Sequence, residues 1–406
     1  MDSTDNTNPA FEDVGVHVDP APPAAEEPPG AIEPLEPASR RPGGPVARRI
    51  YTTGNGELDG EVTEMIKALA ATLPAGAPPI ASPDLELERE MLTSALRLVL
   101  QRADRAELKM VNSALKELAY SFRVFAPYKH LPKVSIFGSA RVMPNDPAYV
   151  ATREFAREIA ERGWMVITGA GPGIMAAGHE GAGADHSFGA NIRLPALNPA
   201  NAYIAKDGKL INFKYFFTRK VTFLKESKAF VLLPGGWGTL DETFELLTLV
   251  QTGKSDLHPI VLLQPEGSSY WDEWSEFVRR SVLGAGFILE SDLALFCIAH
   301  TPIEAVEEIE RFYANYVSAR FVGDRLVLRL RRAPQPDDLG RLKRDFADLL
   351  EHGAFEVIPP TPAEMRDDDA LECERLAFYP RHAYGRIRQL IDELNRLVID
   401  ETVEEP

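Results

Sequence analysis

The sequence lacks most features that mark secreted, disulfide-stapled or membrane-spanning proteins. Its 406 residues include only two cysteines, Cys297 and Cys373, which lie too far apart to form a disulfide framework or a Cys-x-x-Cys metal clip. No uninterrupted apolar run reaches the ~18 residues that a membrane-spanning helix needs. The first residues, MDSTDNTNPAFED, are acidic and lack the basic-then-apolar order of a secretory signal. We therefore expect a cytoplasmic protein without a membrane partner.

An excess of basic residues is also missing. The formal net charge is −17, which argues against a nucleic-acid polymer or an acidic membrane as partner, because phosphate-rich surfaces need basic patches. Most of this charge belongs to the two ends, since residues 1–39 and 400–406 together contribute −13. The first 50 residues hold ten prolines and one aromatic side chain, Phe11. Such a composition predicts a disordered tail over residues 1–49, serving as a solubilising extension, with a docking role as the alternative.

The pattern of apolar residues along the chain changes near Lys133. Before it, apolar spacing predicts a helical segment over residues 50–130, with helices at 57–73 and within 84–125, separated by a Pro-rich linker at 74–83. After it, short β-rich apolar runs alternate with amphipathic stretches, and these runs are 134–138, 165–169, 189–195, 229–234, 259–264 and 293–299.

Apolar strands that alternate with helices indicate a parallel sheet that is buried on both faces. We therefore predict an α/β fold, a doubly wound Rossmann-like sheet over residues 131–318, in which a ligand binds beyond the carboxyl ends of the strands. Residues 319–406 read as a small α/β appendage, with a strand at 324–334 and helices at 336–351 and 382–398.

The first glycine-rich loop follows the predicted strand 165–169. Gly169, Gly171 and Gly173 allow a sharp turn and a close approach to a ligand, and a helix starting near Ile174 would point its free N–H groups at an anion. The spacing G-x-G-x-G differs from the G-x-G-x-x-G dinucleotide fingerprint. The next predicted strand also lacks the terminal acidic residue that would bind an NAD ribose. A bound NAD is therefore not expected.

The second glycine-rich loop, PGGWGT, follows the predicted strand 229–234. Gly235, Gly236 and Gly238 expose backbone donors, and Thr239 adds a hydroxyl at the start of the next predicted helix, so that one phosphate would fit here. The G-x-x-x-x-G-K-[ST] pattern of P-loop NTPases is absent. Either loop alone is compatible with a plain strand-to-helix turn, but two in one sheet favour a binding site.

Two charged groups lie near these loops. The sequence TLDE at 239–242 fits the capping box T-x-x-E, so Glu242 has a purely structural alternative as the cap of its own helix. The helix predicted over 211–227 is aromatic and aliphatic except where Arg219 and Lys220 interrupt it. An arginine in such a setting usually pairs with a carboxylate or a phosphate. The alternative for Arg219 is a surface side chain with its stem on apolar neighbours.

Together these motifs resemble the LONELY GUY family, whose characterised members are cytokinin riboside 5′-monophosphate phosphoribohydrolases. That family pairs an Arg-Lys helix with P-G-G-x-G-T-x-x-E, which are found here at 219–220 and 234–242. Its other elements are also present, namely Gly138 and Ser139 after the first strand and the G-x-G-x-G-[IL]-M loop at 169–175. Segments 191–204 and 215–220 resemble the longer, second type of this family, and the resemblance spans about residues 110–320.

The resemblance implies cleavage of a nucleoside 5′-monophosphate into free base and ribose 5-phosphate, through an oxocarbenium-like transition state. Glu242 would stabilise the cationic sugar and activate water, and Arg219 would fix Glu242 and assist the leaving base. The implied substrate-binding residues are Ser139, Gly171, Gly173, Met175, Lys220, Gly235, Gly236, Gly238 and Thr239. No cofactor and no metal is expected, since the eight histidines form no spaced ligand cluster.

The resemblance also implies a homodimer or an assembly of dimers, with the active site near the subunit interface. The helices of 57–125 would either extend that interface or pack on the Rossmann-like body. Phe217 replaces a histidine that is common two residues before the arginine, and Asp241 replaces a glutamate, so the base pocket differs from the first type. Members of this family are often labelled lysine decarboxylases. No lysine of this sequence has a recognisable context for a Schiff base with pyridoxal phosphate, so the sequence does not support that activity.

Two other functions remain open at this point. One is a nucleosidase with broader specificity for nucleoside 5′-monophosphates, acting in nucleotide salvage. The other is a non-catalytic nucleotide or cofactor carrier on the same fold, against which the presence of both Arg219 and Glu242 argues.

Overall fold

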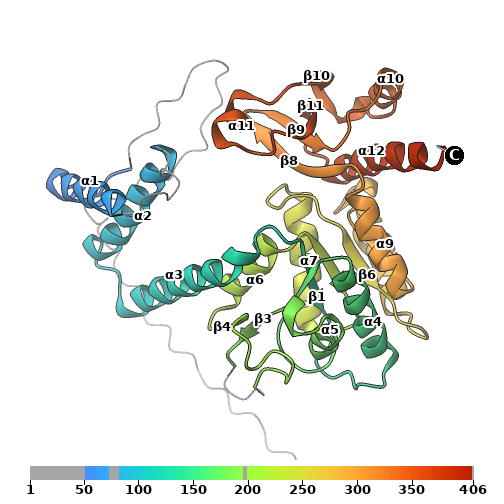
Figure 1. Cartoon of the computed structure of the whole chain (residues 1–406), viewed down its shortest axis with the longest axis horizontal. Helices are drawn as coiled ribbons and strands as arrows, with labels where there is room; N and C mark the ends of the chain where they lie inside the picture. The colour runs from blue at the N-terminus through green and yellow to red at the C-terminus, as the bar shows by residue number, and fades with distance from the viewer. Residues whose placement is uncertain (1–50, 73–81, 195–198, 405–406) are drawn as a thin grey trace, which may run out of the picture. The chain divides into compact units, whose positions relative to one another are not determined.

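The computed structural model describes residues 51–72, 82–194 and 199–404 (Figure 1). The predicted disordered tail, the Pro-rich linker except its last two residues (82–83), and the last two residues of the chain lie outside these ranges. The chain divides into two compact units, one up to Arg102 and one from Ala103 onward. In the first unit, helix α1 (Gly56–Ala71) packs against α2 (Ser82–Leu100). No described helix is long and apolar enough to cross a membrane.

The second unit is built on a seven-stranded parallel sheet with the order β4-β3-β2-β1-β5-β6-β7. Its strands are β1 (Lys133–Phe137), β2 (Met165–Thr168), β3 (Ser187–Ile192), β4 (Leu210–Phe213), β5 (Ala229–Leu232), β6 (Ile260–Leu263) and β7 (Cys297–Ala299). The chain first builds the sheet outward from β1 to β4, and then returns to add β5 on the other side of β1. The topological switch point, where ligands bind in such sheets, therefore lies between β1 and β5.

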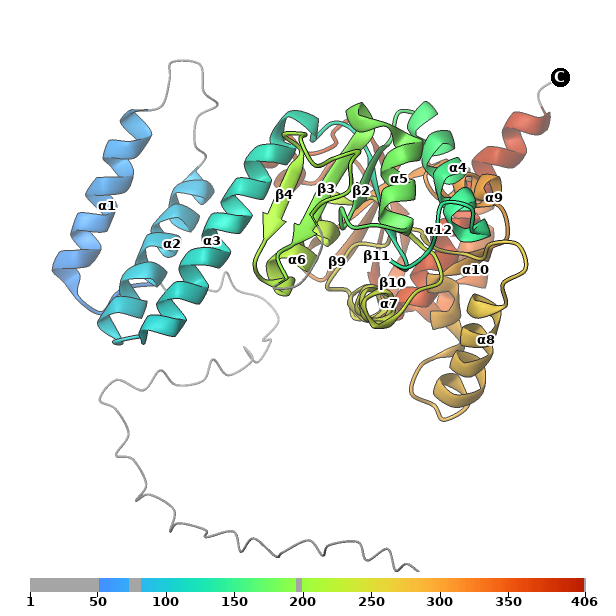
Figure 2. The ribbon, with the colours of Figure 1, turned by 90° about the horizontal axis from the view of Figure 1, so that it is seen from below.

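Helices cover both faces of this sheet (Figure 2). One face carries α4 (Pro147–Glu161), α5 (Ile174–Ala182) and α9 (Pro302–Phe312), whose apolar side chains form one core with the strands. The other carries α3 (Arg105–Phe125), α6 (Phe216–Glu226) and α7 (Trp237–Gln251), which share a second core. Strand β1 supplies Val134 and Ile136 to the first core and Phe137 to the second. This two-sided burial explains why the strands read as continuous apolar runs.

These features confirm the predicted doubly wound α/β fold, with two local corrections. The helix predicted over 211–227 begins as strand β4, and α6 starts only at Phe216. Ile211 and Phe213 are buried, but β4 is a short edge strand, and its pairing with β3 overrides a four-residue pattern too short to reveal its period. The strand predicted over 293–299 shrinks to β7, because a 3₁₀ helix, η4 (Glu290–Leu295), precedes it.

After β6 the chain forms α8 (Tyr270–Phe277) and a π-helical turn, η3 (Val278–Leu283). Short 3₁₀ turns lie at η1 (Ala126–Tyr128), η2 (Ala184–His186) and η5 (Ala347–Leu349).

The C-terminal part forms a separate antiparallel sheet with the order β10-β11-β9-β8. Its elements are β8 (Tyr316–Val322), β9 (Arg325–Leu330), α10 (Pro336–Asp345), β10 (Leu350–Val357), α11 (Pro362–Asp367), β11 (Glu374–Pro380) and α12 (Tyr384–Glu404). The predicted 324–334 strand corresponds to β9, but β8, β10 and β11 were not predicted. The predicted 336–351 helix ends at Asp345. Arg388 of α12 is paired with Glu308 of α9 at 2.6 Å, which ties this part to the parallel sheet.

Candidate active site

The loops after β1 and β5 contact each other at the switch point. The amide of Ser139 donates to the carbonyl of Pro234 at 3.2 Å, and the amide of Leu233 donates to the carbonyl of Phe137 at 2.8 Å. A Cβ atom on Gly235 would collide with the side chain of Thr239, whose own Cβ lies 2.7 Å away. Ser139, Gly235 and Thr239 are therefore brought together, and Gly235 is the position where this contact excludes any side chain.

Helix α7 presents an uncapped N-terminus at this point. Its N-cap is Gly236, which provides no side-chain cap, and the helix begins at Trp237. The first amides of a helix have no partner within it, so those of α7 are available to an anion together with the positive end of the helix dipole. Because α7 begins at Trp237, Thr239 stands in its first turn instead of at the N-cap. Glu242 lies in the second turn, which excludes the capping-box alternative.

The first glycine-rich loop closes against the same region. Gly173 has φ of +65°, and a Cβ there would collide with the backbone of Ser139 and Ala140. The amide of Ile174 donates to the carbonyl of Ser139 at 3.1 Å. Gly173 is thus required both for its conformation and for this close approach, and the start of α5 near Ile174 is confirmed.

A polar pair, the half-buried Asn201 and the buried His179, was missed by the sequence reasoning and holds the first loop in place. The side-chain amide of Asn201 donates to the carbonyl of Gly171 at 2.9 Å, and its backbone amide donates to that of Ala170 at 2.8 Å. His179 is fully buried between Thr168, Asn201 and the carbonyl of Phe188. Burial lowers the pKa of His179, so its imidazole acts as a neutral strut. Only its position on α5, one turn after the loop, could have indicated this role.

Arg219 lies in the first turns of α6 and reaches across the carboxyl ends of β2 and β3. Its Nε donates to the carbonyl of Ala190 at 2.9 Å, and its guanidinium lies 5.3 Å from the ring centroid of Phe223. Its outer nitrogen and the sulfur of Met175 both pack over Gly169, where a Cβ atom would have to displace them. Burial lowers the pKa of Arg219 and the charge of Glu242 opposes this. Arg219 thus interacts with Glu242 through charge while a backbone carbonyl fixes its side chain.

Glu242 is a buried carboxylate without hydrogen-bond donors among the described residues. Its exposed fraction is 8%, and across the described residues no hydrogen bond to it is found. Burial is the largest effect on its pKa and raises it to about 7, although the charges of Lys220 and Arg219 lower it. A carboxylate poised near neutral pH in a partly dry site is suited to activating water or to stabilising a developing positive charge.

Lys220 is placed differently from the other predicted site residues. Its ammonium forms ion pairs with Asp241 at 2.7 Å and with Glu245 at 2.6 Å. Lys220 therefore joins α6 to α7 and places a positive charge near Glu242, while its ammonium points to carboxylates of α7 and not to the glycine loops.

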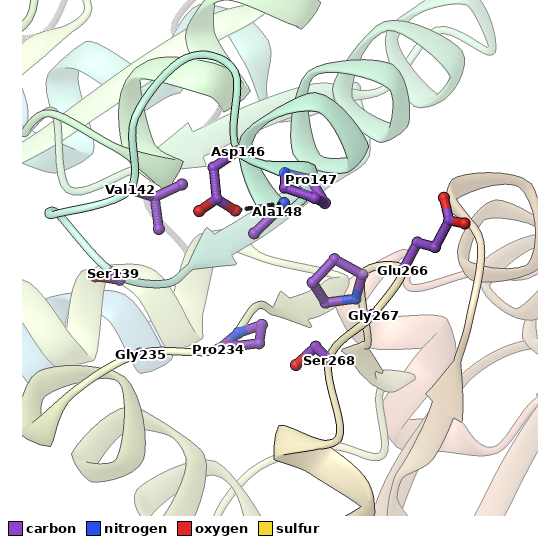
Figure 3. A pocket seen from close by; sticks show the side chains of 11 residues that line it. Ser139, Val142, Asp146, Pro147, Ala148, Pro234, Gly235, Glu266, Gly267 and Ser268 are labelled. Atoms are coloured by element: carbon purple, nitrogen blue, oxygen red, sulfur yellow. Dashed lines mark hydrogen bonds between the residues drawn. The ribbon is translucent and has the colours of Figure 1, made fainter.

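A pocket of about 440 Å³ opens at the switch point beside Gly235 (Figure 3). Its walls come from the loop after β1, the start of α4, the loop after β5 and the loop after β6, with the polar lining residues Ser139, Asp146, Glu266 and Ser268. Arg219 and Glu242 are not among the lining residues. Sequence reasoning missed Asp146, although an Asp-Pro pair that starts a helix is a recognisable N-cap signal.

Within the described ranges, no group of three or more His, Cys, Asp or Glu side chains is placed to hold a metal ion.

Comparison with known proteins matches this region. The family model described as "Possible lysine decarboxylase" matches residues 172–309, which include Arg219 and Glu242. The cytokinin riboside 5′-monophosphate phosphoribohydrolase LOG of Oryza sativa subsp. japonica is 30% identical over 173 residues, covering 41% of this chain and 67% of that protein. The chain belongs to the LONELY GUY (LOG) family.

Coverage of other LOG relatives is smaller. The rice protein named probable cytokinin riboside 5′-monophosphate phosphoribohydrolase LOGL2 is 36% identical over 94 residues, covering 23% of this chain and 37% of that protein. The chain thus spans between about a third and two thirds of the length of these LOG relatives. The molybdenum cofactor binding protein of Rippkaea orientalis is 21% identical, with 44% of this chain and 96% of that chain covered and a TM-score of 0.33. A TM-score of 0.33 is too low to assign the fold, so the fold is assigned from the strand order of this chain and not from its similarity to that protein.

Proposed function

We propose that this chain hydrolyses the N-glycosidic bond of a nucleoside 5′-monophosphate, AMP or a cytokinin ribotide, to give the free base and ribose 5-phosphate. The proposal depends on the state of Glu242. Its carboxylate is buried, accepts no hydrogen bond among the described residues and has a pKa of about 7. It lies one turn beyond the uncapped N-terminus of α7. The names of the LOG relatives support the same reaction.

The phosphate of the substrate would bind at the start of α7. The amides of Trp237 and Gly238 are the first of the helix, and the dipole of α7 favours an anion there. Gly235, Gly236 and Thr239 complete the cradle on one side, and Ser139 closes it on the other. Gly171, Gly173 and Met175 would border the substrate on the β2 side, since Gly173 contacts the backbone of Ser139.

Glu242 and Arg219 would carry the chemistry. As the bond between C1′ and the base nitrogen breaks, its electrons leave with the base and positive charge develops on the ribose. The ionised Glu242 stabilises that charge and accepts a proton from the attacking water, whose oxygen forms the new bond to C1′. Arg219, held by the carbonyl of Ala190, would place its positive charge near the departing base. The base takes a proton from solvent water as it leaves, and Glu242 then returns its proton to solvent, so that the net reaction consumes one water molecule. Lys220 would set the position and pKa of Glu242.

Cytoplasmic location and self-association also belong to this proposal. The expected homodimer or assembly of dimers would form over α6, because Phe216, Phe217 and Val221 of this helix are each about half exposed. Sedimentation velocity of the full chain, compared with a Val221→Asp variant, tests it: the native chain should sediment as a dimer, and the variant as a monomer.

A substrate panel tests the activity and separates the alternatives. Purified full-length chain is incubated with AMP, GMP, IMP, CMP and isopentenyl-AMP, and released base is quantified by chromatography. Base release restricted to AMP or isopentenyl-AMP supports the proposal. Comparable release from all five would instead indicate a broad salvage nucleosidase. Tight binding of a nucleotide with no base release would indicate a carrier and contradict the hydrolase.

A further inference from the structure

We infer that Asp146 recognises the ribose hydroxyls of the substrate from the wall of the 440 Å³ pocket beside Gly235. This inference rests on the proposed function and names the residue that makes its site selective for a ribose over a deoxyribose. Asp146 belongs neither to the glycine loops nor to the Arg219–Glu242 pair.

The carboxylate of Asp146 is exposed to solvent, and a backbone amide holds one of its oxygens. It is the N-cap of α4, and one of its oxygens accepts a hydrogen bond from the amide of Ala148 at 2.9 Å. In Figure 3 the side chain extends into the pocket from the α4 wall, across from Pro234 and Ser268. The amide bond holds one oxygen, and the second oxygen remains an acceptor for a ligand in the pocket.

The chemistry of the lining favours hydroxyl groups over a phosphate. Asp146 and Glu266 are its charged members, and the lining contains no lysine or arginine. Two carboxylates repel a phosphate, whereas a carboxylate is the usual acceptor for the vicinal hydroxyls of a ribose in Rossmann-like folds. Ser139 and Ser268 add hydroxyls to the same walls. The pocket is thus suited to the hydroxyl edge of the sugar, with the phosphate and C1′ outside it.

The position of the pocket points to the same part of the ligand. Ser139 and Gly235 line it and also belong to the phosphate cradle at the start of α7. The ribose is joined to the phosphate through a single methylene group, so it must occupy space directly beside that cradle. The pocket is open to solvent, and its volume of about 440 Å³ leaves room for a ribose ring.

The walls of this pocket are firmly connected. The hydroxyl of Tyr270 donates to the carbonyl of Gly235 at 2.7 Å, linking the start of α8 to the second glycine loop. Ser268 donates its amide to the carbonyl of Pro265 at 3.1 Å in a tight turn, in which Gly267 has φ of +76°. Asp146 therefore faces a wall of fixed shape, as a specificity contact requires.

Binding of sugar phosphates tests the inference without requiring turnover. Dissociation constants of ribose 5-phosphate and 2-deoxyribose 5-phosphate are measured by calorimetry for the native full-length chain and for Asp146→Ser. Serine keeps the N-cap of α4 but withdraws the carboxylate. We expect the native chain to prefer ribose 5-phosphate by about 10-fold or more, as for a hydrogen bond to a charged group, and Asp146→Ser to reduce the preference below about 3-fold.

Two control variants isolate the contact. Asp104→Ser makes the same substitution at the N-cap of α3 and should keep the native preference. Glu266→Gln removes one negative charge from the same pocket and should strengthen binding of both sugar phosphates without changing their ratio. An unchanged preference in Asp146→Ser, an equal loss in Glu266→Gln, or no binding of either sugar phosphate would overturn the inference.

Base release from AMP is scored on the same preparations. Turnover with an unchanged sugar preference in Asp146→Ser would refute the role of Asp146 alone. Absence of turnover in the native chain would refute the proposed function, while the binding comparison would still decide the role of Asp146.

Discussion

Two buried glutamates, one in each sheet region, behave in opposite ways. Glu242 of α7 has burial raising its pKa to about 7. Glu364 of α11, in the C-terminal sheet, is fully buried. Burial would raise the pKa of Glu364 too, but hydrogen bonds from the amide and hydroxyl of Thr361 and from Arg329 and Arg375 lower it to about 2.

The difference lies in the partners and not in the burial. Glu364 accepts bonds from two guanidinium groups, with Arg329 Nε at 2.9 Å and Arg375 Nε at 3.1 Å, so its charge is satisfied and serves to join α11 to β9 and β11. Glu242 has charges near it and no hydrogen bond among the described residues. A buried carboxylate without hydrogen bonds lowers the stability of the fold. Such a group is typically found where it acts on a ligand.

The largest expected effect is on turnover. Glu242→Gln keeps the shape of the side chain and removes the charge that the transition state needs, so kcat for base release from AMP should fall by about 1,000-fold or more. AMP binding should change by less than about 3-fold, because the phosphate cradle is untouched. Initial rates and calorimetry measure both quantities.

Glu226→Gln is the matched control for this variant. Glu226 has the same exposed fraction of 8% as Glu242, but its carboxylate is paired with Lys225 at 2.5 Å. It is the last residue of α6, whereas Glu242 lies near the start of α7. Its kcat should remain within about 3-fold of the native value. Equal losses of kcat in the two variants would show that any buried glutamate of this region is structurally required, and would contradict a catalytic Glu242.

The next largest effect is on stability in the C-terminal sheet. Glu364→Gln leaves Arg375, which is fully buried, without its carboxylate partner. We expect the free energy of unfolding to fall by about 3–5 kcal/mol, measured by urea denaturation at pH 7. The kcat at a temperature well below the transition should stay near the native value. A loss of kcat with unchanged stability would contradict the contrast between the two glutamates.

Glu242→Gln should have the opposite effect on stability. Native Glu242 binds its proton more strongly than in the unfolded chain, so the native protein loses stability as pH rises from about 4.5 to 7, by up to ~3 kcal/mol. The variant should therefore be more stable than the native chain at pH 8, and this gain should vanish near pH 5. Urea denaturation at the two pH values checks this, and a variant less stable at pH 8 would contradict it.

A smaller effect is expected in the phosphate cradle. Gly235→Ala places a methyl group against Thr239, whereas Gly236→Ala has no atom within 4 Å of the new Cβ. Gly235→Ala should lower kcat/KM for AMP by on the order of 100-fold, because a displaced α7 start misplaces the phosphate. Gly236→Ala should stay within a few-fold of the native value. Similar losses in both would mean that loop flexibility matters, and not the close contact.

The smallest effect is a shift in pH dependence. If the ionised Glu242 is required, kcat/KM rises with pH through a limb near pH 7. Lys220 lowers the pKa of Glu242, so Lys220→Gln should move the limb to higher pH. The pH–rate profiles of the two proteins with AMP measure the shift, and a limb that moves downward would contradict the assigned role of Lys220.

The sequence predicted the fold class because its strands are apolar throughout and its helices are periodic. It missed β4, whose pattern is too short to be read without its partner strand, and it missed β8, β10 and β11 in the C-terminal sheet. The glycine loops were predictable because Gly173 and Gly235 serve local geometry that only glycine allows. The N-cap role of Asp146 was readable from its Asp-Pro pair. The pocket that Asp146 lines and the contacts of His179 arise between distant segments, which spacing does not reveal.

The proposed reaction depends on Glu242 being a buried carboxylate that titrates near neutral pH. A ¹³C-carboxyl NMR titration of glutamate-labelled full-length chain, with the Glu242 signal identified by its loss in Glu242→Gln, tests this directly. We predict a midpoint near pH 7 for Glu242 and, in the same spectra, a signal of Glu364 that stays ionised down to the lowest pH at which the fold survives. A Glu242 midpoint at or below about 4.5, the ordinary value for a glutamate, would contradict the account.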